Sequence, residues 1–171
     1  QTGLGATGDM WAHEAWGLQD PPDFVTFSKK FQTGGFYLRR ELRPAESYRV
    51  FNTWMGDPHK LVLLEVILQT VREEGLIEST REAGSALKAA LGRTQQRFPK
   101  LVSGLRGRGT FCAFDLPTPA IQVEFLKRLR NAGMEAGGCG ESSIRFRPAL
   151  IFRREHAELA GDIVERVAAS F

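Results

Sequence analysis

Hydrophobic residues at helical spacing predict two consecutive helices in the middle of the chain. Asp57-Pro58 is typical of a helix start, because aspartate can cap free backbone N–H groups and proline suits the first turn. A helix over 57–74 places these apolar residues on one face: Leu61, Leu64, Leu68 and Val71. Ser79-Thr80-Arg81-Glu82 has capping-box spacing, so a second helix is expected from there to Phe98-Pro99.

Short apolar runs bounded by glycine and proline predict strands on either side of these helices. The first two are expected at 24–27 and 36–38. After residue 100 the expected order is strand 101–105, a turn at Gly107-Arg108-Gly109, strand 110–116, a helix from Pro119, strands 134–136 and 143–146, and a helix over 154–169. This order predicts a compact α+β unit whose helices cover one face of a sheet.

Composition narrows the class of protein. The chain has 171 residues and a formal net charge of +3, and its basic residues are scattered among acidic ones. We therefore expect neither a nucleic-acid partner nor a membrane-spanning segment. Arg106-Gly107-Arg108-Gly109 occurs once, which favours a turn over an RNA-binding repeat. The spacing of Cys112 and Cys139 matches neither a disulfide framework nor a zinc motif, so no metal site is expected.

Candidate chemistry lies at Lys29 and Lys30, between an apolar run and Gly34-Gly35. Lysines are usually solvated, but an amine held in a dry pocket has a lowered pKa and can condense with carbonyl groups. Glycines allow the backbone to approach a ligand closely. In an extended segment neighbouring side chains point to opposite faces, so we expect only one of the two lysines to face a given site. The residue pattern alone leaves both readings open.

Several motifs, in order and along essentially the whole chain, resemble the class-III aminotransferases, which depend on pyridoxal phosphate and have fold type I. The resemblance is strongest to the animal members that act on 4-aminobutyrate. The motifs are Gln1-Thr2-Gly3, Trp11-Ala12-His13-Glu14, Asp23 to Lys30, Phe51-Asn52-Thr53-Trp54, Arg106 to Cys112, Gly137 to Gly140 and Ile144 to Pro148. The resemblance implies an α/β fold of which this chain is the C-terminal part. Residues 1–56 would end the cofactor-binding large domain, 57–98 would be connecting helices, and 99–171 would form the small α+β domain.

The resemblance also implies roles for individual residues. Lys29 matches the reactive lysine, since a small residue precedes it and Thr33-Gly34 follows at the family spacing, whereas Lys30 fits less well. Gln1 matches a glutamine beside the cofactor ring, and Thr53 a threonine that binds the cofactor phosphate of the other subunit in a homodimer. Arg145 matches the arginine that binds the substrate carboxylate, for which a planar guanidinium is suited. Arg147 is interpreted as structural.

The activity implied by the resemblance is transfer of an amino group from 4-aminobutyrate to 2-oxoglutarate in the mitochondrial matrix. The alternatives are a β-alanine or ornithine ω-aminotransferase, or a non-catalytic dimerisation module derived from the same fold. Because the chain begins at Gln1, we expect it to be roughly the C-terminal third of such an enzyme and inactive alone. The aspartate that protonates the cofactor ring, the phosphate-binding loop and the ligands of any iron–sulfur cluster would precede it.

Overall fold

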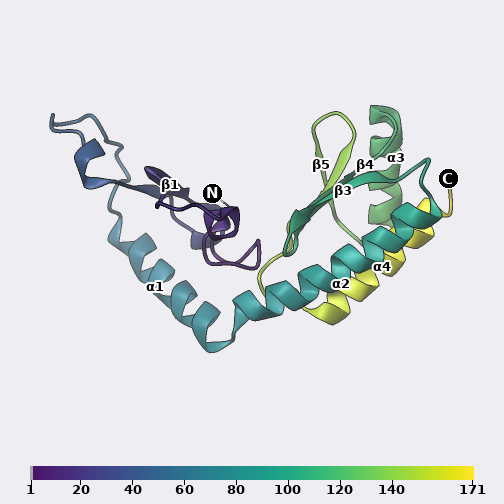
Figure 1. Ribbon diagram of the computed structural model, residues 1–171. Coiled ribbons are helices and arrows are strands. Elements are labelled where there is room, and N and C mark those ends of the chain that lie inside the picture. Colours follow the sequence, from purple (N-terminus) through teal and green to yellow (C-terminus); the bar gives the residue numbers. More distant parts are fainter. Residues whose placement is uncertain (1) are drawn as a thin grey trace.

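The computed structural model describes residues 2–171, and its N-terminal part contains short elements around a two-stranded ribbon (Figure 1). The strands β1 (Phe24–Phe27) and β2 (Gly35–Leu38) are antiparallel, with Phe24 opposite Leu38. Three short 3-10 helices accompany them: η1 (Ala12–Trp16), η2 (Lys29–Phe31) and η3 (Arg40–Leu42). Both strands lie close to where the apolar runs predict them.

Two helices follow, α1 (Pro58–Glu73) and α2 (Leu76–Arg97). The Asp57 side chain caps α1 by accepting a hydrogen bond from the His59 backbone N–H at 3.1 Å, as the sequence predicts. The predicted capping box at residues 79–82 is wrong, because α2 already begins at Leu76. Gly75, at φ +60°, turns the chain between the helices, and the Thr80 hydroxyl donates to the Leu76 carbonyl within α2. None of the helices among residues 2–171 is long and apolar enough to cross a bilayer.

The C-terminal half forms an antiparallel sheet in the order β3-β4-β6-β5, built from β3 (Ser103–Arg108), β4 (Phe111–Asp115), β5 (Gly137–Cys139) and β6 (Ser143–Phe146). The β3–β4 turn lies at 109–110, slightly later than predicted. The strand predicted at 134–136 lies at 137–139 instead. The Met134 N–H donates to the Leu129 carbonyl, so these residues close α3 (Pro119–Asn131) rather than join the sheet.

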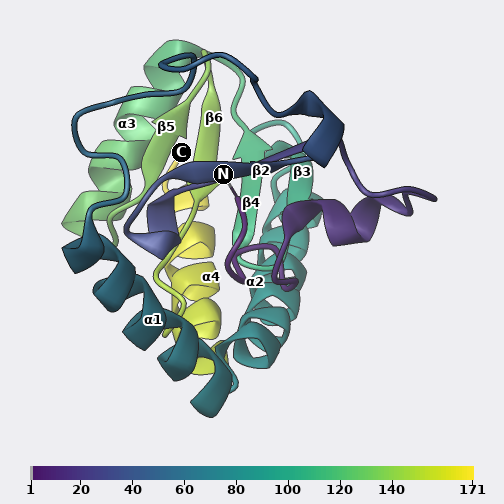
Figure 2. The ribbon, with the colours of Figure 1, turned by 90° about the vertical axis from the view of Figure 1, so that its left-hand side faces the viewer.

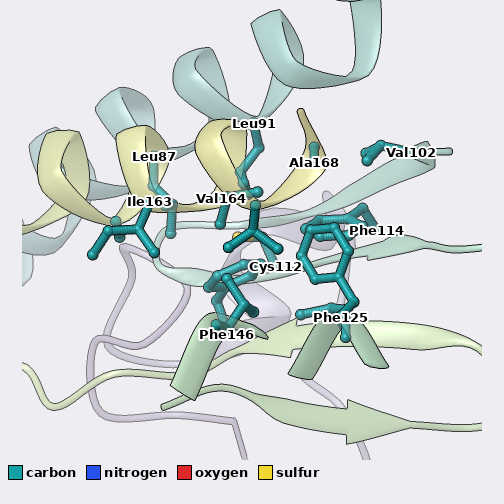
Figure 3. Close-up of a cluster of buried hydrophobic side chains, with 14 of the residues drawn as sticks. Leu87, Leu91, Val102, Cys112, Phe114, Phe125, Phe146, Ile163, Val164 and Ala168 are labelled. Atoms are coloured by element: carbon teal, nitrogen blue, oxygen red, sulfur yellow. The ribbon is translucent and has the colours of Figure 1, made fainter. Parts of the chain in front are cut away.

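The main core lies between one face of this sheet and the helices (Figure 3). Helix α4 (Arg154–Ala168) packs along α2. Alternate residues of the central strands point toward the helices and are buried: Cys112, Phe114, Ile144 and Phe146. Phe114 meets Phe125 of α3 edge-to-face, with ring centroids 5.8 Å apart. The core therefore has the single-faced arrangement that the strand and helix order predicts.

A second, smaller cluster joins the N-terminal elements to the helix pair. Its buried members are Leu4, Phe31, Val71 and Leu76. In Figure 2 the β1–β2 ribbon lies in front of the four-stranded sheet, and α4 lies behind the sheet. The second cluster holds the lysine-bearing segment close to the sheet face that the helices leave uncovered.

Candidate active site

The lysines lie in a tight turn rather than in a strand. Strand β1 ends at Phe27, and residues 29–31 form the 3-10 helix η2. Lys29 has φ +61° and Gln32 has φ +56°, and the Gln32 N–H donates to the Lys29 carbonyl at 2.9 Å. A left-handed backbone costs a residue with a Cβ roughly 1–2 kcal/mol, so the surroundings must hold this turn in place. Phe31 is 4% exposed and belongs to the second cluster, and its burial there holds the turn against the rest of the protein.

This turn brings both lysines to one cavity of about 680 Å³, which we call the lysine cavity. Its other lining residues are Thr2, Gly3, Ala6, Gln32, Ile67, Phe111, Arg147, Pro148, Ala149 and Leu150. The expectation that only one lysine could face a given site is therefore wrong. Side-chain alternation holds in extended backbone, and the left-handed conformation of Lys29 interrupts it.

The two amines have different surroundings. Lys30 is half-buried, and its Nζ donates a hydrogen bond to the Pro148 carbonyl oxygen at 2.5 Å. Burial lowers the pKa of the Lys30 ammonium, and the positive charge of Arg147 lowers this pKa further. Lys29 is exposed beside it, at the mouth of the same cavity. By desolvation alone, Lys30 would be the candidate for the reactive amine. The strained backbone instead favours Lys29 as this candidate.

The two arginines of β6 and its extension line different cavities. Arg145, paired across the sheet with Ala113 and Gly137, lines a smaller cavity of about 350 Å³ that also contains Glu135. It is not among the residues lining the lysine cavity. Arg147 lines both cavities. The sequence reading treats Arg147 as structural, yet it is the guanidinium that this chain places beside the lysines; its position two residues after Arg145 is the signal that could have indicated this.

Thr53 lies apart from the lysine cavity, in the turn at 53–56 before α1. The turn is shaped by Asn52, whose side-chain oxygen accepts from the Trp54 N–H at 3.0 Å. Thr53 is exposed, and it is surrounded in sequence by the exposed aromatic side chains of Tyr48, Phe51 and Trp54. This chain alone does not bring Thr53 to the lysines. Gln1, the other predicted cofactor contact, lies outside the described residues.

No metal centre is visible in the part of the chain that the structure describes, since no three His, Cys, Asp or Glu residues gather there. Cys112 is buried, and its burial raises the pKa of its thiol to about 12. Cys139 is exposed on β5.

Comparison with known proteins decides the family. The sequence model of the family described as "Aminotransferase class-III" matches residues 1–168 of this chain. The chain belongs to the class-III aminotransferase family. The predicted fold class, the C-terminal part of a pyridoxal-phosphate-dependent transferase with mixed helices and sheets, is confirmed.

Curated class-III aminotransferases match the chain along most or all of its length. It is 49% identical over 171 residues to the mitochondrial 4-aminobutyrate aminotransferase of Homo sapiens, covering all of this chain and 34% of that protein. It is 50% identical over 156 residues to the 4-aminobutyrate aminotransferase of Dictyostelium discoideum, covering 91% of this chain and 32% of that protein. The chain therefore spans about a third of the length of the curated relatives it matches.

Solved aminotransferase structures share the fold. A lysine aminotransferase from M. tuberculosis superposes with a TM-score of 0.89 at 33% identity, over 98% of this chain and 39% of that chain. An ornithine δ-aminotransferase from Plasmodium falciparum superposes with a TM-score of 0.84 over all of this chain and 44% of that chain. Its identity of 22% shows similarity of fold alone.

Class-III aminotransferases use pyridoxal phosphate, and the lysine cavity fits a molecule that is both an aldehyde and an anion. It offers an amine for the aldehyde, and Lys30 and Arg147 supply positive charge for the phosphate or a carboxylate. None of the residues lining it carries a carboxylate. Beside the reactive turn, the buried hydroxyl oxygen of Ser28 has no hydrogen-bond partner among the described residues, so it can still accept or donate one bond.

Proposed function

We propose that this chain is the C-terminal part of a 4-aminobutyrate aminotransferase. In the proposed reaction, the amino group of 4-aminobutyrate moves to 2-oxoglutarate, giving succinate semialdehyde and glutamate. The observation that carries the proposal is the 49% identity to the human mitochondrial enzyme over all 171 residues. A mitochondrial location rests on the names of the animal relatives.

Lys29 is proposed as the catalytic amine. When bound, pyridoxal phosphate supplies an aldehyde that reacts with amines and a ring that accepts the electron pair released at the substrate carbon. The Lys29 amine would hold the cofactor covalently, leave it when the substrate amine arrives, and then carry the proton between substrate and cofactor carbons. Its place on a strained turn at the cavity mouth supports this role. The Lys30 amine is instead directed at the Pro148 carbonyl.

Arg145 and Arg147 supply the guanidinium groups for anionic substrates. We keep Arg145 as the proposed carboxylate-binding residue because it matches the family motif, and it projects from β6 into the smaller cavity. Arg147 connects that cavity with the lysine cavity. Guanidinium binds a carboxylate through two parallel hydrogen bonds, so a substrate held there would be oriented as well as attracted.

Thr53 is proposed to bind the cofactor phosphate of a partner subunit, with Gln1 beside the cofactor ring. The exposed aromatic side chains around Thr53 support a homodimer, since Tyr48 is 85% and Trp54 is 74% exposed in this chain. Large apolar side chains gathered on a surface mark an interaction site. Any iron–sulfur cluster is proposed to belong to a region outside this chain, and neither Cys112 nor Cys139 is proposed as a ligand.

Borohydride reduction of the full-length protein loaded with pyridoxal phosphate tests the assignment, because it fixes the cofactor to the lysine that holds it. Peptide mapping is expected to find the label on Lys29 and none on Lys30. Lys29→Ala should abolish the visible absorbance band and transamination. A label on Lys30 would refute the assignment of the catalytic amine.

The substrate is tested with the same preparation. Single-turnover conversion should be at least about tenfold faster with 4-aminobutyrate than with ornithine, lysine or β-alanine, since substrate specificity is a ratio of kcat/KM values. A faster reaction with ornithine or lysine would make the chain part of a different ω-aminotransferase. No reaction with any amine would favour the non-catalytic module.

A further inference from the structure

We infer that Lys30 is a positioning residue, whose bond to the Pro148 carbonyl fixes the Lys29 turn against the end of the strand that carries Arg145. This inference rests on the proposed role of Lys29. It assigns a function to the second lysine of the pair, which does no covalent chemistry itself.

The bond joins parts of the chain that are far apart in sequence. Lys30 and Pro148 are separated by 118 residues, and the N–O distance is 2.5 Å. On one side, Lys30 directly follows the left-handed Lys29 and precedes the buried Phe31. On the other side, Pro148 follows Arg147 directly and lies two residues beyond the end of β6. The bond therefore connects the turn that carries Lys29 directly to the end of the strand β6, which carries Arg145.

The surroundings favour a fixed bond over a surface contact. Lys30 is half-buried, so its ammonium has lost part of its hydration and depends on the carbonyl oxygen for compensation. A charge-assisted hydrogen bond of this kind is stronger than a neutral one. Breaking the bond removes the carbonyl partner of a half-buried ammonium, which favours the geometry in which the turn and the end of β6 stay together.

Two of the contacts that hold the strained turn reach parts of the chain outside it. Phe31 holds it through the second cluster, and Lys30 holds it through the strand extension. Without the Lys30 contact, the turn could relax toward ordinary backbone angles, and the Lys29 amine would move relative to Arg145 and Arg147. A displacement of about 1 Å of a reacting group can lower a rate by about a hundredfold, so modest loosening would be measurable.

Hydrogen exchange on the full-length protein without cofactor tests the contact directly. Lys30→Met removes the donor and keeps most of the apolar side chain. We expect the Gln32 amide, which donates to Lys29, and the Phe152 amide, which donates to Ala149, to exchange at least about tenfold faster. The Leu116 amide, which donates to Ser142 in the main sheet region, should be unchanged. Lys100→Met, at an exposed lysine away from the cavity, is the matched control and should change none of the three amides.

The loaded enzyme gives the second readout. Lys30→Met should keep the borohydride label on Lys29 but lower kcat about tenfold, with a smaller change in KM, and shift the pH midpoint of the visible absorbance band. Lys30→Arg, which keeps a charged donor, should restore kcat to within about threefold of wild type. If Lys30→Met does not fold, Lys30→Gln, with a neutral donor, takes its place and should give an intermediate shift.

The outcomes separate this inference from the proposed function. Wild-type exchange, rate and midpoint in Lys30→Met, with the label still on Lys29, would overturn the positioning role and leave the proposed function intact. A wild-type label on Lys30 would overturn the proposed catalytic assignment, and the positioning role with it. Failure of Lys30→Arg to restore either readout would also count against the Pro148 contact as the cause.

Discussion

Two regions of the molecule differ in how completely they bury their apolar side chains. The first is the N-terminal region, up to about residue 57, and the second runs from α2 to α4. The second region closes its own core: Phe114, Phe125 and Ile144 are fully buried between sheet and helices. In the first region, Leu4 and Phe31 are buried against Val71 of α1 and Leu76 of α2. Many other large apolar side chains of this region are exposed, including Phe51. The second region therefore buries its large apolar side chains far more completely than the first.

Most of the candidate chemistry lies in the first region. Lys29, Lys30 and Thr53 all belong to the first region, while the second contributes Arg145 from the internal strand β6 and Arg147 from just beyond its end. Strained backbone also concentrates there, at Leu4, Lys29, Gln32 and Tyr48. A well-packed region can hold a strand still while its neighbour carries a strained reactive turn. The comparison therefore predicts that stability and activity can be changed separately.

The largest effect is expected for Phe114→Ala. Phe114 is fully buried and contacts two other rings, so its removal should lower the free energy of unfolding by about 3–5 kcal/mol. Phe31→Ala, in the smaller cluster whose half-buried neighbours can close around the gap, should cost about 3 kcal/mol, the lower end of the same range. Urea unfolding of both variants measures the difference. Equal costs would break the contrast between the two regions.

Two glycines of α2 give a smaller effect with opposite signs. A Cβ at Gly84 would lie 2.3 Å from the carbonyl carbon of Gly109, so Gly84→Ala should destabilise the protein by about 1–3 kcal/mol. At Gly92 the nearest atom, Cδ2 of Leu105, would be 3.8 Å away. Gly92→Ala should therefore stabilise the helix by about 0.5–1 kcal/mol. Thermal unfolding compares the pair, and two changes of the same sign would contradict the close approach of α2 to the β3–β4 turn.

The two cysteines both belong to the second region and test how firmly its core is closed, with little change in stability near neutral pH. Burial raises the pKa of the Cys112 thiol from 9.0 to about 12, so the folded state favours the protonated form. The stabilisation from this group is fully present below pH 9.0 and is lost as the pH rises from there to about 12. At pH 8 an alkylating reagent should modify Cys139 at least about a hundredfold faster than Cys112, as measured by peptide mapping. Rapid modification of Cys112 in folded protein would show that the main core opens easily.

Much of the fold could be predicted because local signals agreed with tertiary packing. Asp57-Pro58 starts α1, and the alternation around Phe114 identifies a strand with one buried face. The start of α2 could not be placed from the sequence. Gly75 ends α1 by adopting a left-handed conformation, and a four-residue match to a capping pattern carries no information about that geometry.

The candidate site was predictable by residue type but not by arrangement. Lys29, Thr53 and Arg145 come from motif resemblance, and their roles stay predictions. The structure showed instead what spacing could not: a left-handed residue places both lysines on one cavity, and Arg147 lies between two cavities. Such positions depend on contacts over more than a hundred residues of sequence, as between Lys30 and Pro148.

The exposed apolar surface that begins at Tyr48 and continues along α1 to Val66 has a consequence during biosynthesis. Until that surface is covered, side chains such as Trp54 and Val62 present a binding site for holdase chaperones and a route to aggregation. If the proposed homodimer covers this surface, unpaired subunits would be removed by quality-control proteases, which act on unprotected polypeptide. A faster rate of synthesis would raise the fraction of subunits that pair and escape proteolysis. The amount of protein in a cell would then rise more steeply than its rate of synthesis.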